Sequence, residues 1–413
     1  MFYGWVVVGV AFVGQFVASG LVFYTFGVAL KDVAAEFDAG RLGVSGIHLV
    51  MPWTGAVIAP VVGRLAVAGH LRALLFGGAL SIGAGFVLAA RATELWHLYL
   101  IYPLLMAFGA NTLSGVGAST LVVNWFAKRR ATALGLSQIG ASAGGMVMGP
   151  VAGWLFAEHG WRDVYTGFGV AALALAPLVG WLAVGRPADR GLHADGDPAP
   201  PTPRDAGAAP APAPHVREAL RDPRLWQVAF VAGVGFMLSG AVVTHLVAFA
   251  TDQGLDRVRA PALLSVLALG ALAGKPVFGL LADRIGERRA YALAIVLQIA
   301  GLLALAAAPS GVALFAVAAL FGFGNGGNLP LSGALVARAF GPALFGPMMG
   351  FAMLVLTPIV AAGTPFAGWV YDTTGAYAIA FVAFAALAAA SLVALRALAL
   401  PEAEDAPASP SAG

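Results

Sequence analysis

Long apolar segments alternate with short polar ones along almost the whole chain. A helix needs about 20 apolar residues to cross the hydrocarbon of a bilayer, so the pattern predicts twelve membrane-spanning helices. Their expected ranges are 4–30, 43–66, 71–91, 95–124, 131–156, 162–184, 225–250, 260–282, 290–308, 311–337, 344–368 and 375–398. The spans divide six and six around a Pro/Ala-rich segment, which we expect to be a partly disordered cytoplasmic linker. The predicted parts are residues 1–184, the linker 185–224, residues 225–400 and a disordered tail 401–413.

Composition supports an integral membrane protein. Of the 413 residues, 60% are hydrophobic and 10% are charged, whereas soluble domains average about 45–50% and about 25%. The net charge of +3 does not indicate nucleic-acid binding, because the basic residues lie in short loops between apolar spans. The chain has no cysteine, and it shows no metal-ligand spacing, phosphate-binding loop or Ser/His/Asp arrangement. We therefore expect no metal, no cofactor and no enzymatic activity.

The N-terminus lacks a basic leader, so we interpret it as a first span rather than a signal peptide.

The two halves share an internal repeat. PVAGWLFAEHG, from Pro150, matches PFAGWVYDTTG, from Pro365, at an offset of 215 residues. PVVGRLA, from Pro60, matches PVFGLLA, from Pro276, at an offset of 216. Because six spans return the chain to the same side, the halves are parallel repeats about an axis along the membrane normal. The predicted fold class is all-α integral membrane, with twelve transmembrane helices in two parallel six-helix repeats and a central site between them.

Basic residues predict the orientation. If the N-terminus is cytoplasmic, 16 of the 23 Lys and Arg residues lie on the cytoplasmic side and six lie outside. The outer six are Lys31, Arg41, Arg91, Arg162, Arg257 and Arg259. We therefore expect a multi-pass protein of the plasma (inner) membrane with both termini cytoplasmic. The remaining basic residue, Lys275, lies inside an apolar run.

One loop motif resembles that of a known family. GLLADRIGERR, residues 279–289, is similar to the G-x-x-x-D-R-x-G-R-R loop of the major facilitator superfamily, and the resemblance extends over residues 1–400. It implies the major facilitator fold, solute transport by alternating access, and a monomer. The N-half equivalent, GRLAVAGHLR, has Val67 where the acidic residue belongs. The residues that the resemblance assigns to cytoplasmic gating are Gly279, Asp283 and Arg284.

A second resemblance narrows the family. NWFAKRRATALGLSQIGASAGG followed by HGWRDVYTGFG is similar to helices 4–6 of monocarboxylate-transporter-like and oxalate/formate-exchanger-like proteins. In animal monocarboxylate transporters the eighth helix carries an Asp and, four residues on, an Arg before a Pro. Here Ala271 stands at the Asp position and Lys275 at the Arg position. The first-helix Lys of that family has no equivalent near Phe23–Tyr24. The resemblance implies a carboxylate substrate, but not proton coupling through an eighth-helix Asp.

Lys275 has two interpretations. The repeat aligns it with Ala59, so the scaffold does not need a charge there, and a charge at this depth costs about 2.5–3.5 kcal/mol on insertion scales. Snorkelling is one interpretation, since the cytoplasmic end of the helix is about 9–10 Å away. In the other, the ammonium faces the central site and binds a carboxylate. No Asp or Glu lies in a membrane interior to pair with it.

Further polar residues within the spans are candidates for the substrate site. A histidine titrates in the physiological range and can carry a proton, and Asn or Tyr can hydrogen-bond a solute. The alternative is interhelical hydrogen bonding, worth about 0.6 kcal/mol on average. The candidates are Tyr24, His48, Asn111, His245 and Asn328. The small residues of GASAGGMVMGPVAG, 140–153, predict a close-packing interface against the other half.

The sequence thus predicts a secondary active or facilitative transporter of a small organic anion, a mono- or dicarboxylate. Its expected partners are the anion, protons or a counter-anion, and the bilayer, with no nucleic acid. An alternative is a multidrug or metabolite exporter, in which Lys275 would be incidental. A membrane sensor is a third class, which the short linker and the lack of a signalling domain disfavour.

Overall fold

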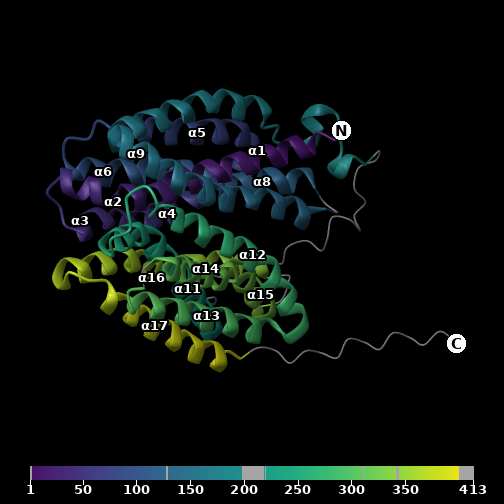
Figure 1. Ribbon diagram of the computed structural model, residues 1–413. Coiled ribbons are helices and arrows are strands. Elements are labelled where there is room, and N and C mark those ends of the chain that lie inside the picture. The colour runs from purple at the N-terminus through teal and green to yellow at the C-terminus, as the bar shows by residue number, and fades with distance from the viewer. Residues whose placement is uncertain are drawn as a thin grey trace.

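The computed structural model describes residues 2–126, 129–197, 218, 220–309, 311–340 and 344–399, and within them the chain is helical (Figure 1). The predicted tail, 401–413, and most of the predicted disorder in the linker lie outside these residues. The helices of the N-terminal half are α1 (Gly4–Phe16), η1 (Val17–Tyr24), α2 (Thr25–Glu36), α3 (Arg41–Ser45), α4 (Ile47–Leu65), η2 (Ala66–His70), α5 (Leu71–Ala89), α6 (Leu95–Ile101), η3 (Tyr102–Met106), α7 (Ala107–Leu113), α8 (Val116–Trp125) and α9 (Arg130–Leu182). The linker contains η4 (Pro187–Arg190) and η5 (Ala194–Gly196). The C-terminal half consists of α11 (Pro223–Asp252), α12 (Ala262–Ile285), α13 (Glu287–Ala306), α14 (Val312–Gly326), α15 (Asn328–Phe340), α16 (Phe345–Thr374) and α17 (Ala378–Ala397).

Within the described residues, eleven helical segments are long and apolar enough to cross a membrane. The longest, Thr132–Leu182, has 51 residues, which at 1.5 Å per residue is about 77 Å, enough to cross the hydrocarbon twice. Gly160 breaks it with a φ of 75°, a conformation that glycine adopts without steric cost. The segment is therefore two spans, and the predicted twelve are confirmed.

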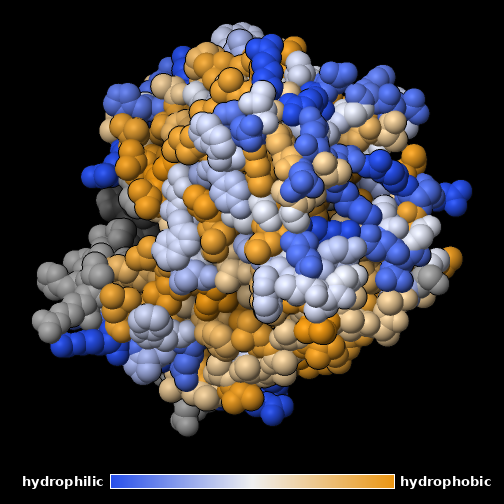
Figure 2. Space-filling model, turned by 90° about the vertical axis from the view of Figure 1, so that its left-hand side faces the viewer, coloured by the Kyte–Doolittle hydropathy of each residue, from blue (hydrophilic) through white to orange (hydrophobic). Residues whose placement is uncertain are grey.

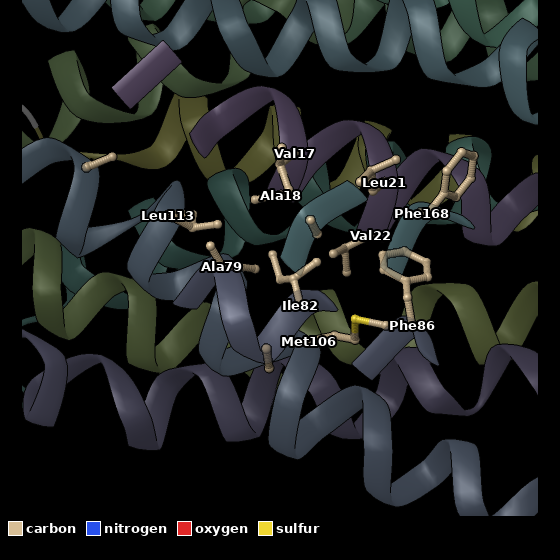
Figure 3. Packing of buried hydrophobic residues seen from close by; sticks show 14 of the residues in the cluster. Val17, Ala18, Leu21, Val22, Ala79, Ile82, Phe86, Met106, Leu113 and Phe168 are labelled. Carbon is tan, nitrogen blue, oxygen red and sulfur yellow. The ribbon is translucent and has the colours of Figure 1, made fainter. Parts of the chain in front are cut away.

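The two sets of helices form two bundles that lie one above the other in Figure 1. Each bundle has its own cluster of buried apolar side chains. In the first, Ile82 and Phe86 of α5 pack with Val22 of the first span and Phe168 of α9 (Figure 3). Because lipid tails are as apolar as these side chains, such packing depends on close contact rather than on escape from water. The two bundles match the two six-span halves of the repeat.

Three spans are irregular near their middle. The first contains the π-helical segment η1, the fourth is interrupted at Gly115, where ψ is −113°, and the tenth at Gly327, between α14 and α15. The repeat offset brings the two interruptions within three residues of correspondence, since Gly115 aligns with Pro330. Paired interruptions of this kind are typical of the helices that line a central solute site.

The start of the linker folds back on the N-terminal half. Trp125 Nε1 donates to the carbonyl of Val184 at 2.7 Å, and Asn124 Nδ2 donates to the carbonyl of Gly185 at 3.0 Å. The Arg190 guanidinium lies 3.6 Å from the centre of the Tyr3 ring, a favourable cation–π distance. These contacts identify the end of the bundle at which α1 begins and α9 ends, called here the linker end.

Candidate functional site

Lys275 lies where the two halves meet. Its Nζ donates to Ser142 Oγ at 2.8 Å, which joins α12 of the C-terminal half to α9 of the N-terminal half. A helical side chain leans toward the N-terminus of its own helix. The Lys275 amine therefore points away from the linker end, whereas snorkelling would require it to point toward that end. Ser142 follows the first residue of α9, Arg130, by 12 positions, about 18 Å along the helix. This geometry favours an ammonium deep in the seam between the halves.

The small residues of α9 make this contact possible. A Cβ on Gly153 would lie 2.3 Å from the Pro261 ring, just before α12, and Ser265 Oγ donates to the carbonyl of Met146. On another face, a Cβ on Gly144 would lie 2.6 Å from the carbonyl oxygen of Phe16. Residues 140–153 therefore form the expected interface with the other half. They also form a second close-packed surface, which lies against the first span.

Tyr24 reaches the same stretch of α9. It is the last residue of the π-helical segment η1, and a Cβ on Gly145 would lie 2.3 Å from its ring. Gly145 follows Ser142 by three positions, nearly one helical turn. Tyr24 and Lys275, which come from opposite halves, thus contact neighbouring positions of α9.

The two asparagine candidates make hydrogen bonds within the protein. Asn111 Nδ2 donates to the carbonyl of Ala107 in its own helix at 2.9 Å. Asn328 is only 2% exposed; its Nδ2 donates to Asn325 Oδ1 at 2.8 Å, and its Oδ1 accepts from Gln298 Nε2 at 3.0 Å. These contacts join α13 to the tenth span, as expected for interhelical hydrogen bonding. Neither of these hydrogen bonds connects Asn328 to Lys275.

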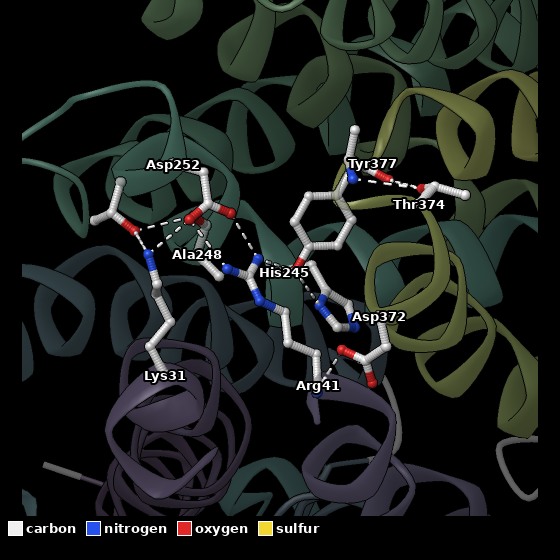
Figure 4. Close-up of polar contacts among 10 residues, drawn as sticks. Lys31, Arg41, His245, Ala248, Asp252, Asp372, Thr374 and Tyr377 are labelled. Atoms are coloured by element: carbon white, nitrogen blue, oxygen red, sulfur yellow. Dashed lines mark hydrogen bonds and ion pairs between the residues drawn. The ribbon is translucent and has the colours of Figure 1, made fainter. Parts of the chain in front are cut away.

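The strongest polar network between the halves lies at the opposite end from the linker, called here the latch end. Arg41, at the start of α3, pairs with Asp252 of α11 at 2.7 Å and donates from Nη1 to Tyr377 Oη at 2.6 Å (Figure 4). Its backbone N–H donates to Asp372 Oδ1 at 2.8 Å, and its guanidinium lies 3.4 Å from the Tyr371 ring centre. One N-half residue therefore contacts four C-half residues.

Two more ion pairs reinforce this network, which we call the latch. Lys31 of α2 pairs with Asp252 at 2.7 Å, and Arg257 pairs with Asp32 of α2. Among the described residues, the three ion pairs that join the two halves all lie at this end. Figure 2 views the molecule from this end and shows many hydrophilic residues on it. Because the pairs hold the halves together here, the structure is closed at the latch end.

Both span histidines lie beside the latch rather than beside Lys275. His245 is fully buried; its Nε2 lies 2.9 Å from the Thr364 carbonyl oxygen and its Nδ1 lies 3.0 Å from Tyr377 Oη. His48 Nδ1 lies 3.2 Å from Thr244 Oγ1, across the two halves. The Tyr377 hydroxyl therefore links the His245 ring to the latch.

The predicted gating residues do not meet the other half in this conformation. Asp283 and Arg284 are exposed, and they make no ion pair within the part of the chain that the structure describes. A Cβ on Gly279 would meet nothing within 4 Å, so no close helix contact requires a glycine there. In the same loop, Glu287 accepts a hydrogen bond from Arg338 at 2.8 Å, within the C-terminal half.

Sequence reasoning missed the latch. It treated Lys31 and Arg41 only as outer loop charges that indicate orientation, and it did not assign a role to Asp372 or Tyr377. A usable signal was present, because basic residues at the outer ends of N-half spans face acidic residues at the outer ends of C-half spans. Which basic residue pairs with which acidic residue cannot be derived from their positions along the chain.

Comparisons with known proteins agree with this architecture. A family model described as Major Facilitator Superfamily matches residues 11–274 and 260–413. The chain is 28% identical over 391 residues to human monocarboxylate transporter 11, covering 92% of this chain and 79% of that one. It is 29% identical over 386 residues to bovine monocarboxylate transporter 13, covering 92% and 85%. A bacterial homologue of the human lysosomal transporter Spinster, crystallised inward-facing and unoccupied, has a TM-score of 0.66 at 16% identity, covering 96% and 94%. The likeness to that structure concerns the fold, and it confirms the predicted fold class.

Proposed function

This chain belongs to the major facilitator superfamily and is a multi-pass membrane transporter, not an enzyme; on that premise we propose that it carries small mono- or dicarboxylates by alternating access, with Lys275 binding the carboxylate. The matched relatives named monocarboxylate transporters support this substrate class. They do not favour the alternative of a multidrug or metabolite exporter. We further propose that the linker end is cytoplasmic, at the plasma (inner) membrane, as the distribution of Lys and Arg indicates.

The observation that carries the proposal is an ammonium in the seam whose hydrogen-bond partner, among the described residues, is a hydroxyl. Lys275 donates to Ser142, and it has no acidic partner among the described residues. A cation removed from water is stabilised chiefly by an anion with good hydrogen-bond geometry. Since the spans supply no carboxylate at this depth, a carboxylate from solution is the natural counter-charge. A bound anion would neutralise the seam and make it easier for the two halves to rock.

The latch supplies the second element of alternating access. It closes the end that we assign to the outside, so solute cannot exchange at that end in the described conformation. Release of Arg41 from Asp252 and Tyr377 would open the outer end. Tyr24, Asn111, His48, His245 and Asn328 remain candidates for contacts with solute in other conformations, and Gly279, Asp283 and Arg284 remain candidates for a latch at the cytoplasmic end when that end closes.

A counterflow screen tests the function. Purified protein in liposomes loaded with unlabelled carboxylate should accumulate labelled lactate-, formate- or oxalate-type anions transiently, because exchange of bound solute needs no energy source. Liposomes without protein give the background. Transport of dyes or drugs with no counterflow of any carboxylate would replace this proposal with the exporter.

Replacing Ser142 with Asp should inhibit transport from inside the protein. The new carboxylate would lie within reach of Lys275, whose Nζ is now 2.8 Å from Ser142 Oγ. A tethered group acts at an effective concentration far above that of free solute, so we expect the half-saturating carboxylate concentration to rise about tenfold or more. The matched neutral variant, Ser142→Asn, should raise it much less. Equal values in the two variants would contradict a carboxylate-binding role for Lys275.

A further inference from the structure

Four polar side chains form a continuous set of hydrogen bonds across the C-terminal half, called here the amide network. Gln298 Nε2 of α13 donates to Asn328 Oδ1 at 3.0 Å, and Asn328 Nδ2 donates to Asn325 Oδ1 at 2.8 Å. Asn325 Nδ2 of α14 donates to Ser239 Oγ of α11 at 3.1 Å. The network therefore runs from α13 through the interrupted tenth span to the seventh span, where it ends on a hydroxyl.

The network has one direction because it begins at a backbone carbonyl. Gln298 Nε2 also donates to the carbonyl of Ala294, at 3.4 Å, and a carbonyl oxygen can only accept. This contact places the amide nitrogen of Gln298, rather than its oxygen, beside Asn328. Each asparagine then accepts from the preceding residue and donates to the next. Ser239 Oγ accepts at the end of the network, so its own hydroxyl proton is left to donate elsewhere.

The Ser239 hydroxyl does not donate to its own helix. Serine side chains inside helices often donate to a backbone carbonyl of the preceding turn, as Ser332 does to Leu329 at 2.9 Å. Ser239 makes no such bond within the part of the chain that the structure describes, where its hydrogen bond is the one that it accepts from Asn325. A donor is therefore available at this point of α11.

Ser239 also lies where α11 is open. Between residues 231 and 250, every residue of α11 is buried except Phe236, Ser239 and Gly240. This helix packs against α2 of the N-terminal half and against α15 and α16 of its own half. Because neighbours from both halves flank it, the opening at Ser239 faces the seam between the halves.

Lys275 lies beside the amide network on the adjacent eighth span. A Cβ on Gly326, the residue after Asn325, would lie 2.9 Å from the backbone nitrogen of Lys275. Ser239 follows the first residue of α11 by 16 positions, about 24 Å along the helix, so it too lies deep within the membrane. An ammonium and a hydroxyl donor are thus presented to the same seam from neighbouring spans.

We propose that Ser239 is a second binding point that determines which anions are carried: Lys275 binds the carboxylate, and the Ser239 hydroxyl donates to another oxygen atom of the same anion. This inference rests on the proposed function, and it narrows the substrate class to short carboxylates that carry an oxo or hydroxyl group. An acid without that oxygen leaves the hydroxyl proton unpaired in the seam, which disfavours binding. Asn325, Asn328 and Gln298 are positioning residues that act through Ser239.

Competition during counterflow tests this proposal with two anions that differ at one carbon. Pyruvate has a carbonyl group where propionate has a methylene. With full-length protein in liposomes and labelled pyruvate as the probe, unlabelled pyruvate should compete at a concentration about three- to tenfold lower than propionate, the range expected for one neutral hydrogen bond. In Ser239→Ala this ratio should fall to about one, because pyruvate loses its extra hydrogen bond. Ser239→Thr, which keeps a hydroxyl, should retain the preference.

Two further variants separate recognition from folding. Ser332→Ala removes a buried hydroxyl of the tenth span that donates to its own helix, so the ratio should stay at the wild-type value. Asn325→Ala leaves the Ser239 hydroxyl free to turn toward its own helix, so the ratio should fall while propionate competes as before.

The outcomes are distinguishable. Absence of counterflow with every carboxylate overturns the function itself. Counterflow of formate but not of pyruvate, or equal competition by pyruvate and propionate in the wild type, overturns the second binding point alone, and this readout needs no variant to fold. An unchanged ratio in Ser239→Ala or Asn325→Ala, or an equal loss in Ser332→Ala, also overturns it. Strong competition by lactate with equally weak competition by pyruvate and propionate would show that the hydroxyl accepts rather than donates, and would overturn it too.

Discussion

Replacing Lys275 with Ala is expected to reduce carboxylate counterflow by about 10- to 100-fold. A hydrogen bond to a charged group contributes about 1.5–3 kcal/mol, and about 1.4 kcal/mol corresponds to a factor of ten. The substitution removes the ammonium that lies in the seam but leaves its neighbour Ser142 in place. The measurement is the initial rate of labelled carboxylate uptake by counterflow, with the amount of folded protein in the liposomes matched by size-exclusion chromatography.

Two variants control this prediction. Lys275→Arg keeps the positive charge, and a guanidinium can hold a carboxylate through two parallel hydrogen bonds, so it should retain most of the rate. Ser142→Ala removes only the hydroxyl that accepts from the amine, and it should also transport. A wild-type rate in Lys275→Ala would show that the solute is bound elsewhere.

Replacing Arg41 with Gln is expected to open the latch end. The Arg41 side chain is only 9% exposed, and it pairs with Asp252 and Tyr377 of the other half. Truncating one partner of a buried, hydrogen-bonded charge pair costs about 2–5 kcal/mol. That cost falls on the closed conformation alone, so the ratio of open to closed molecules should rise by about 30-fold or more.

Cysteine labelling measures this shift. The chain has no cysteine, so Val247→Cys gives a single reporter. Val247 is 5% exposed and lines a small cavity together with the latch residues Lys31 and Arg257. A membrane-impermeant maleimide added outside should label the reporter faster in the Arg41→Gln background.

Lys31→Gln is the matched control for the latch. Lys31 pairs with the same carboxylate, but its side chain is 38% exposed, and exposed ion pairs contribute about 0.2–1 kcal/mol. Its effect on labelling should therefore be much smaller. Equal labelling rates in the two variants, or no change in either, would mean that Arg41 does not hold the closed conformation.

The fold was predictable because the bilayer constrains each span separately. A segment that crosses hydrocarbon must be long, apolar and helical whatever its neighbours are, so the twelve spans can be read one at a time. The repeat then related the two halves, and it singled out Lys275 by showing Ala59 at the matching position. The break at Gly160, which divides α9 into two spans, lies in the predicted gap between the fifth and sixth ranges.

The site was less predictable because it depends on how the halves meet. Ser142 as the partner of Lys275, and Asp252 as the partner of Arg41, come from helices more than 130 residues apart in sequence, and their register is set by the packing of small residues on α9. Polar residues such as Asn328 and His245 have the same character in sequence whether they face a solute or a neighbouring helix. Only the residues that contact such a side chain show whether it faces a solute or a neighbouring helix.

The way that Asp372 engages the second span has a consequence for how anions would approach. Its two carboxylate oxygens accept from the N–H groups of Arg41 and Leu42, each at 2.8 Å. Separation of the halves would leave these N–H groups, the Arg41 guanidinium, the Lys31 ammonium and the Asp32 carboxylate on one rim of the entrance, with a net positive charge. Asp252, Asp372 and Arg257 would move away on the other rim, with a net negative charge. The entrance would then carry positive charge on one side and negative charge on the other. The positive side would attract anions from solution before they reached Lys275.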